Sequence, residues 1–84
     1  MDRLGIITLN VLNANEAFGA MTAMSAYEIA DELHSAYKPG SVYKHLTKFE
    51  KLGLVKTGFK DGKANTYFIT EEGKVSLAEA KKAG

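Results

Sequence analysis

The chain has 84 residues, enough for one small domain that we expect to span residues 1–84. Its apolar content of 45%, charged content of 25% and net charge of +1 are ordinary for a soluble globular protein. The absence of cysteine excludes disulfides and thiolate metal sites, and no apolar run approaches the roughly 20 residues that span a bilayer, so we expect a cytoplasmic protein that does not enter a membrane.

The first part of the chain is predicted to form a helix and a connector. Apolar residues at helical spacing predict a helix over residues 4–16, with a stripe wide enough for one side to be buried. Residues 17–24 then form the connector, in which Gly19 permits a turn and residues 21–24 can form one short strand.

Capping signals predict a second helix over residues 26–36. Ser25 and Glu28 have the spacing of a capping box, in which the serine hydroxyl accepts a hydrogen bond from the glutamate amide. The glutamate carboxylate in turn accepts from the serine amide. Pro39 biases the residue before it away from helical backbone, so a break is expected at residues 37–40.

A third helix is predicted over residues 42–52. Ser41 is expected to be its N-cap, because a serine hydroxyl can accept from the free amides of the first turn. Gly53 follows where a helix commonly ends in a left-handed residue.

The remaining residues are predicted to form a hairpin and a final helix. Strands over residues 54–60 and 63–69 flank Asp61-Gly62, a strong signal for a two-residue hairpin turn. Thr70 is expected to cap a last helix over residues 71–83. This element order predicts an α+β fold, a winged helix-turn-helix with a three-helix core, a two-stranded β-hairpin wing and a C-terminal helix.

The predicted third helix has two chemically different sides. At 100° per residue, Val42, Leu46 and Phe49 share the side expected to pack on the core. The nearly opposite side is polar and carries Ser41, Lys44, His45 and Lys48, with Tyr43 and Thr47 at its margins. Lysines can neutralise phosphates, and the hydroxyl and imidazole groups can bond phosphates or base edges, so this side is suited to the major groove of DNA. The Tyr43 ring is equally suited to a core position with a solvated hydroxyl.

The charge distribution supports the same interpretation. Residues 38–63 contain seven lysines against two acids, whereas residues 1–37 contain one base and five acids. Lys60 and Lys63 bracket the predicted hairpin tip, where they can contact the adjacent DNA backbone or minor groove. Taken alone, the lysines would more commonly indicate a solvated surface. Beside a basic helix, contact with DNA is the better explanation.

Several runs resemble the PadR-like winged-helix transcriptional regulators, and more loosely the MarR type. The most specific runs are Pro-Gly-Ser-Val-Tyr at residues 39–43 and Tyr-Phe-Ile-Thr-Glu-Glu-Gly at residues 67–73. The resemblance covers roughly residues 4–77. It implies control of transcription, as a repressor or otherwise, by a homodimer bound to operator DNA, with Ser41 and Tyr43 at the start of the recognition helix.

The sequence also departs from this family. Its last helix is about three turns and lacks a long apolar seam, Lys44 stands where a proline is common, and Phe49 where leucine is usual. Because members of the family dimerise through a longer C-terminal helix or helical domain, we expect self-association of this chain through the helix at residues 4–16. The identity of any effector ligand stays unknown.

Catalysis, metal binding and cofactors are not expected. The two histidines, His34 and His45, lie in different predicted helices without acidic residues at ligand spacing. Adjacent Glu71 and Glu72 point about 100° apart on a helix and cannot form an acid/base couple. The alternative function is a winged helix used for protein–protein contact or assembly, which Leu52, partly on the polar side of the third helix, favours.

Overall fold

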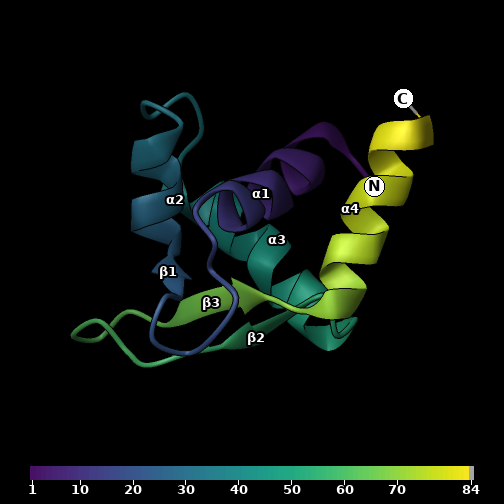
Figure 1. Cartoon of the computed structure of the whole chain (residues 1–84). Coiled ribbons are helices and arrows are strands. Elements are labelled where there is room, and N and C mark those ends of the chain that lie inside the picture. Colours follow the sequence, from purple (N-terminus) through teal and green to yellow (C-terminus); the bar gives the residue numbers. More distant parts are fainter. Residues whose placement is uncertain (84) are drawn as a thin grey trace.

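The computed structural model describes residues 1–83, in which four helices pack with a small sheet that lies along one edge of the molecule (Figure 1). The elements follow the order α1 (Arg3–Ala14), β1 (Met24–Ser25), α2 (Ala26–Glu32), α3 (Pro39–Lys51), β2 (Val55–Thr57), β3 (Thr66–Ile69) and α4 (Glu71–Ala83). The predicted winged helix-turn-helix is confirmed. Within the described residues, no helix is both long and apolar enough to cross a membrane.

The core lies where α1, α2 and α3 meet the sheet. Each helix contributes side chains without solvent exposure, among them Leu9 and Leu12 from α1, Ile29 from α2 and Leu46 from α3. Tyr67 on β3 closes the core from the side of the sheet. The helices therefore hold α3 by its apolar side and leave its opposite side free.

The sheet has three strands: the two of the wing, and β1, which lies at Met24–Ser25 and not over the predicted residues 21–24. The strand order is β1-β3-β2, and both pairings are antiparallel. Ser25 pairs with Thr66 and at the same time caps α2. The predicted capping box is confirmed, because the Glu28 amide donates to Ser25 Oγ at 3.1 Å and the Ser25 amide donates to Glu28 Oε1 at 3.0 Å.

Helix α2 ends at Glu32, so the predicted extension to residue 36 is wrong. The chain turns at His34 and Ser35, whose φ angles of 53° and 59° are left-handed. The Ser35 amide donates to the Ala30 carbonyl at 3.0 Å, and the His34 amide to the Asp31 carbonyl at 2.9 Å. This is a Schellman motif, built here without the usual glycine.

Helix α3 begins at Pro39, three residues before the predicted start. Proline suits the first helical position, since its φ is already helical and the amide it lacks would have no partner there. Lys38 is the N-cap and makes no side-chain capping bond, so the prediction that Ser41 caps the helix is wrong. The predicted end at Gly53 is confirmed: its φ is 77°, and the Leu54 amide donates to the Phe49 carbonyl at 2.9 Å.

The wing, residues 55–69, has shorter strands than predicted, and the turn at its tip lies one residue further along the chain. Four successive pairings from Val55–Ile69 to Gly58–Thr66 keep one register, but the next bridge joins Asp61 to Ala64. Phe59 and Lys60 therefore lie opposite one residue, as in a β-bulge. The bulge moves the turn by one residue, so its central pair is Gly62-Lys63 and the predicted Asp61-Gly62 turn is wrong. A φ of 63° at Gly62 alone fits a type II′ turn.

The start of α4 packs directly on the base of the wing. Thr70 Oγ1 accepts from the Gly73 amide at 3.1 Å, which confirms the predicted cap, and donates to the Gly53 carbonyl at 2.7 Å. Gly73 is buried here, and a Cβ at this position would overlap the Leu54 carbonyl oxygen. The Thr-x-x-Gly run thus joins α4 to the end of α3.

Candidate nucleic-acid interface

The side of α3 that faces away from the core is basic. Val42, Leu46 and Phe49 are buried, as predicted. The direction opposite these three, at 100° per residue, is occupied by residues that are exposed or half-buried, namely Gly40, Lys44, Thr47 and Lys51, with Lys48 beside them. The outward side therefore includes Gly40 and Lys51, which the predicted contact set omitted. A prediction based on the direction opposite the mean of the three apolar side chains would have included both residues in the contact set.

His45 does not share this free side. Its ring is 21% exposed and lies between α3 and the N-terminus of α1. Nδ1 is 2.9 Å from the Ser41 carbonyl oxygen, and Nε2 is 2.9 Å from Asp2 Oδ1. Both partners are acceptors, so only the doubly protonated ring donates to both. Asp2 also caps α1 by accepting from the Gly5 amide at 2.8 Å.

These contacts alter the ionisation of both groups. Burial opposes protonation of His45, but the Ser41 carbonyl and the Asp2 carboxylate outweigh it and hold the pKa of His45 above 6.5 despite nearby Lys48. The hydrogen bond from His45, assisted by the Gly5 amide, lowers the pKa of Asp2 below 3.8. The pair therefore contributes stability from above the ordinary pKa of Asp2 to near pH 6.5. This contribution is lost as pH rises through the raised pKa of His45, or falls through the lowered pKa of Asp2.

Asp2→Asn is expected to flatten this pH dependence. Asparagine still caps α1, so the change removes the charge and keeps the helix start. The melting temperature of the wild type should fall more between about pH 6 and about pH 8.5 than that of the variant. Equal slopes in the two proteins would mean that the ion pair does not contribute to stability.

The other predicted contact residues lie around the outward side. Ser41, Lys44 and Lys48 are exposed on α3. Thr47 is half-buried, and its hydroxyl donates to the Lys44 carbonyl at 2.9 Å. Tyr43 is 46% exposed and leans towards the wing, which favours the surface interpretation of its ring.

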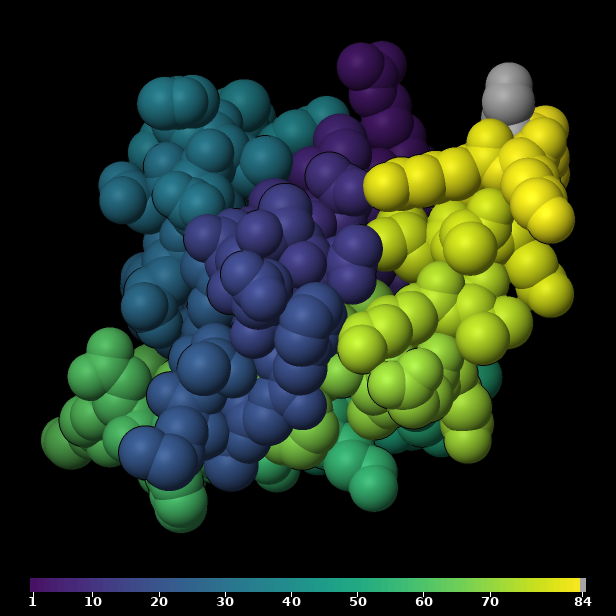
Figure 2. Space-filling view, viewed as in Figure 1, coloured from purple at the N-terminus to yellow at the C-terminus, as the bar shows by residue number. Residues whose placement is uncertain are grey.

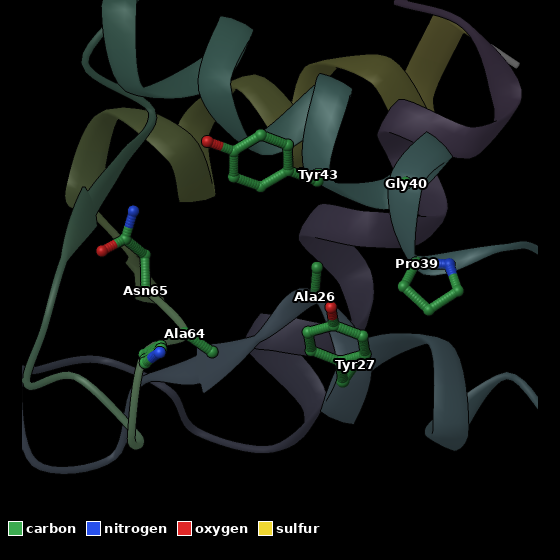
Figure 3. A pocket seen from close by; sticks show the side chains of 8 residues that line it. Ala26, Tyr27, Pro39, Gly40, Tyr43, Ala64 and Asn65 are labelled. Carbon is green, nitrogen blue, oxygen red and sulfur yellow. The ribbon is translucent and has the colours of Figure 1, made fainter.

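Tyr43 lines a hollow of about 330 Å³ between α3 and the wing (Figure 3). Helix α2 contributes Ala26 and Tyr27 to its wall. The remaining lining residues are Pro39 and Gly40 at the start of α3, and Lys63, Ala64 and Asn65 on the wing. The structure thus places Lys63 at the hollow that α3 also lines, whereas Lys60, one of the two bulge residues, is exposed and does not line the hollow. Tyr27 and Asn65 were not predicted, because only the folded wing and α2 place them here.

A family model for the transcriptional regulator PadR-like family matches residues 8–79. The chain belongs to this family. It is thus a DNA-binding winged-helix regulator of transcription, and the resemblance inferred from the motifs is confirmed. No curated protein sequence matches the chain significantly.

Solved structures agree with membership of the PadR-like family. The chain is similar to TubR from Bacillus megaterium pBM400, with 29% identity and a TM-score of 0.77 over 95% of this chain and 86% of that one. A PadR family transcription regulator from Clostridium difficile gives 23% identity and a TM-score of 0.72 over 95% and 84%. A PadR-like transcriptional regulator from Bacillus cereus gives 22% and 0.66 over 94% and 81%. The last two similarities establish the shared fold.

Two features of this PadR-like chain bear on other functions. Among residues 1–83, no three histidine or acidic side chains gather where they could hold a metal ion. Leu52, at the end of α3, is 57% exposed. An aliphatic side chain at this place is the feature that favours a protein partner.

Proposed function

We propose that the chain represses transcription by binding operator DNA in the cytoplasm, with α3 in the major groove and the wing tip, residues 60–63, on the adjacent backbone or minor groove. The observation that carries this proposal is the outward side of α3, where Lys44, Lys48 and Lys51 are exposed. A winged module with a basic helix of this kind binds DNA by phosphate neutralisation and groove contacts. Occupation of a promoter by such a protein would exclude polymerase, and this role needs no catalytic group.

Within this proposal, the residues divide by what they can reach. Lys44, Lys48, Lys60 and Lys63 are assigned to phosphates, which position the protein without reading sequence. Ser41 and Thr47 are assigned to base edges, and Tyr43 to the backbone beside the wing. We predicted that His45 contacts DNA. In this proposal it lies at the edge of the surface that contacts DNA, because the Asp2 carboxylate binds its ring and also caps the first turn of α1.

We further propose that the chain acts as a homodimer formed through α1. A single module reads only a few base pairs, so specific control needs a second copy or a partner. Helix α1 keeps Leu4, Ile6 and Ile7 partly exposed after packing on the core. Figure 2 views the molecule from the face where α1 lies beside α4, while α3 lies behind. Self-association through α1 would therefore leave α3 available to DNA.

Binding to DNA fragments from around its own gene, measured at several salt concentrations, tests the proposed function. Affinity should fall steeply with salt, with a slope of about 0.9 for each phosphate neutralised. Light scattering at two protein concentrations should give twice the chain mass at both. No binding even at low salt would overturn the proposed function and leave a protein partner, reached through Leu52, as the alternative.

A further inference from the structure

We propose that the hollow between α3 and the wing holds one sugar–phosphate strand of the bound DNA, and that Gly40 lacks a side chain so that this strand can approach. The proposal rests on the proposed DNA-binding function and adds to it a defined backbone site. Its elements are Gly40, the exposed side chains of Tyr27 and Tyr43, and Asn65 and Lys63 of the wing.

The position of the hollow identifies its occupant. If α3 enters the major groove and the wing lies over the adjacent minor groove, the strand between these grooves passes between the two elements. The hollow lies between these elements (Figure 3). Its volume of about 330 Å³ is at the lower end of the range for ligand sites, about 300–1,000 Å³.

The lining matches a sugar–phosphate strand in charge and chemistry. No acidic residue lines the hollow, and Lys63 supplies a positive charge. Tyr27 is 67% exposed and Tyr43 is 46% exposed, so both side chains border the solvent. Hydroxyl, amide and ammonium groups are common donors to phosphate oxygens. The small Ala64 and Gly40 leave room for the apolar faces of deoxyribose.

Nothing inside the described chain accounts for glycine at position 40. Its φ is not left-handed, and a Cβ built there meets no atom within 4 Å. Glycine is less favourable than alanine in a helix, because it loses more conformational freedom on folding. No contact within the described chain offsets this loss of stability at position 40. Gly73, by contrast, is required by contact with Leu54. A group outside the protein explains the empty space at Gly40.

Gly40→Ala tests the proposal because it adds one methyl group to the hollow and leaves the fold intact. The variant should melt at the same or a higher temperature than the wild type. Its affinity for duplex DNA should fall about tenfold, and equally for every duplex sequence, because a backbone contact carries no sequence information. Gly19→Ala is the matched control, since its Cβ also meets no atom within 4 Å and it does not line the hollow.

Ethylation of single phosphates in the duplex provides a second readout. In the wild type, ethylation at one phosphate per bound copy should block binding. Tyr27→Phe should weaken binding to unmodified DNA and reduce the further loss caused by ethylation at that same phosphate. If Gly40→Ala binds as tightly as the wild type, or the interference pattern is unchanged in Tyr27→Phe, the backbone site is wrong while DNA binding stands. If the wild type itself binds no DNA, the proposed function and this site both fail.

Discussion

Gly73→Ala is expected to lower the free energy of unfolding by about 3 kcal/mol, the upper range for overpacking a buried site. The added Cβ would overlap the Leu54 carbonyl oxygen and lie 2.7 Å from Ile69 Cγ1. Neither neighbour can move freely, because Leu54 follows the turn that ends α3 and Ile69 pairs with Val55 in the sheet. Urea denaturation followed by circular dichroism measures the change.

The same substitution at Gly40 is the matched comparison for stability. Both glycines lie in the first turn of a helix, but a Cβ at Gly40 meets no other atom. Gly40→Ala should therefore leave stability unchanged or raise it by up to about 0.5 kcal/mol, the lower end of the advantage that alanine has in the middle of a helix. Equal effects of the two substitutions would mean that the contact between α4 and Leu54 is not tight. Since small proteins have about 5–15 kcal/mol of stability, the expected loss at Gly73 is a large share.

The double variant Lys44→Ala/Lys48→Ala is expected to bind DNA about 10- to 100-fold more weakly at low salt. Both lysines are exposed on the outward side of α3, so their removal should not disturb the core. Two lost phosphate contacts should also reduce the slope of log affinity against log salt by about 1.8. Fluorescence anisotropy with a labelled duplex, measured at four or more salt concentrations, gives both quantities.

A second double variant separates local contact from net charge. Lys81→Ala/Lys82→Ala removes the same charge from the last turn of α4, away from α3 and the wing. Its affinity and salt slope should stay close to those of the wild type. Equal losses in the two double variants would show that overall charge, and not the outward side of α3, governs binding.

The parts of the fold that sequence could predict depend on local rules. The Ser25–Glu28 capping box, the left-handed Gly53 and the Thr70 cap each involve residues within five positions of one another. The apolar side of α3 followed from helical periodicity alone. Such features form with the same geometry in many proteins, so a short stretch of sequence is sufficient to predict them.

The wrong predictions concern element ends and turns at which a second local preference, or a contact made only in the fold, outweighs the first. Ser41 is a good capping residue, but Pro39 fits the first helical position and starts the helix earlier. At the end of α2, a Schellman motif forms with His34 in place of glycine, so no glycine in the sequence indicates where the helix ends. The bulge at Phe59 and Lys60 shifts the wing turn, which no turn signal could show.

The site itself was predictable only in part. The exposed lysines of α3 follow from periodicity and charge. The contact of His45 with Asp2 joins residues 43 positions apart, and the approach of Tyr27 to the wing depends on strand β1 joining the sheet. Long-range contacts of this kind have no signature in a single sequence.

Ser25 is both the last residue of β1 and the N-cap of α2. This double role affects how the protein would distinguish one DNA sequence from another. Without a linker between sheet and helix, the wing base cannot swing independently of the helices that hold α3. Ordering these elements costs about 1–2 kcal/mol of conformational free energy for each backbone residue, and this loss occurs when the chain folds, before DNA binds. The protein then meets DNA as a stiff template. In the proposed complex, sequences would be separated by how readily the double helix bends and twists to fit this template, as well as by the bases assigned to α3.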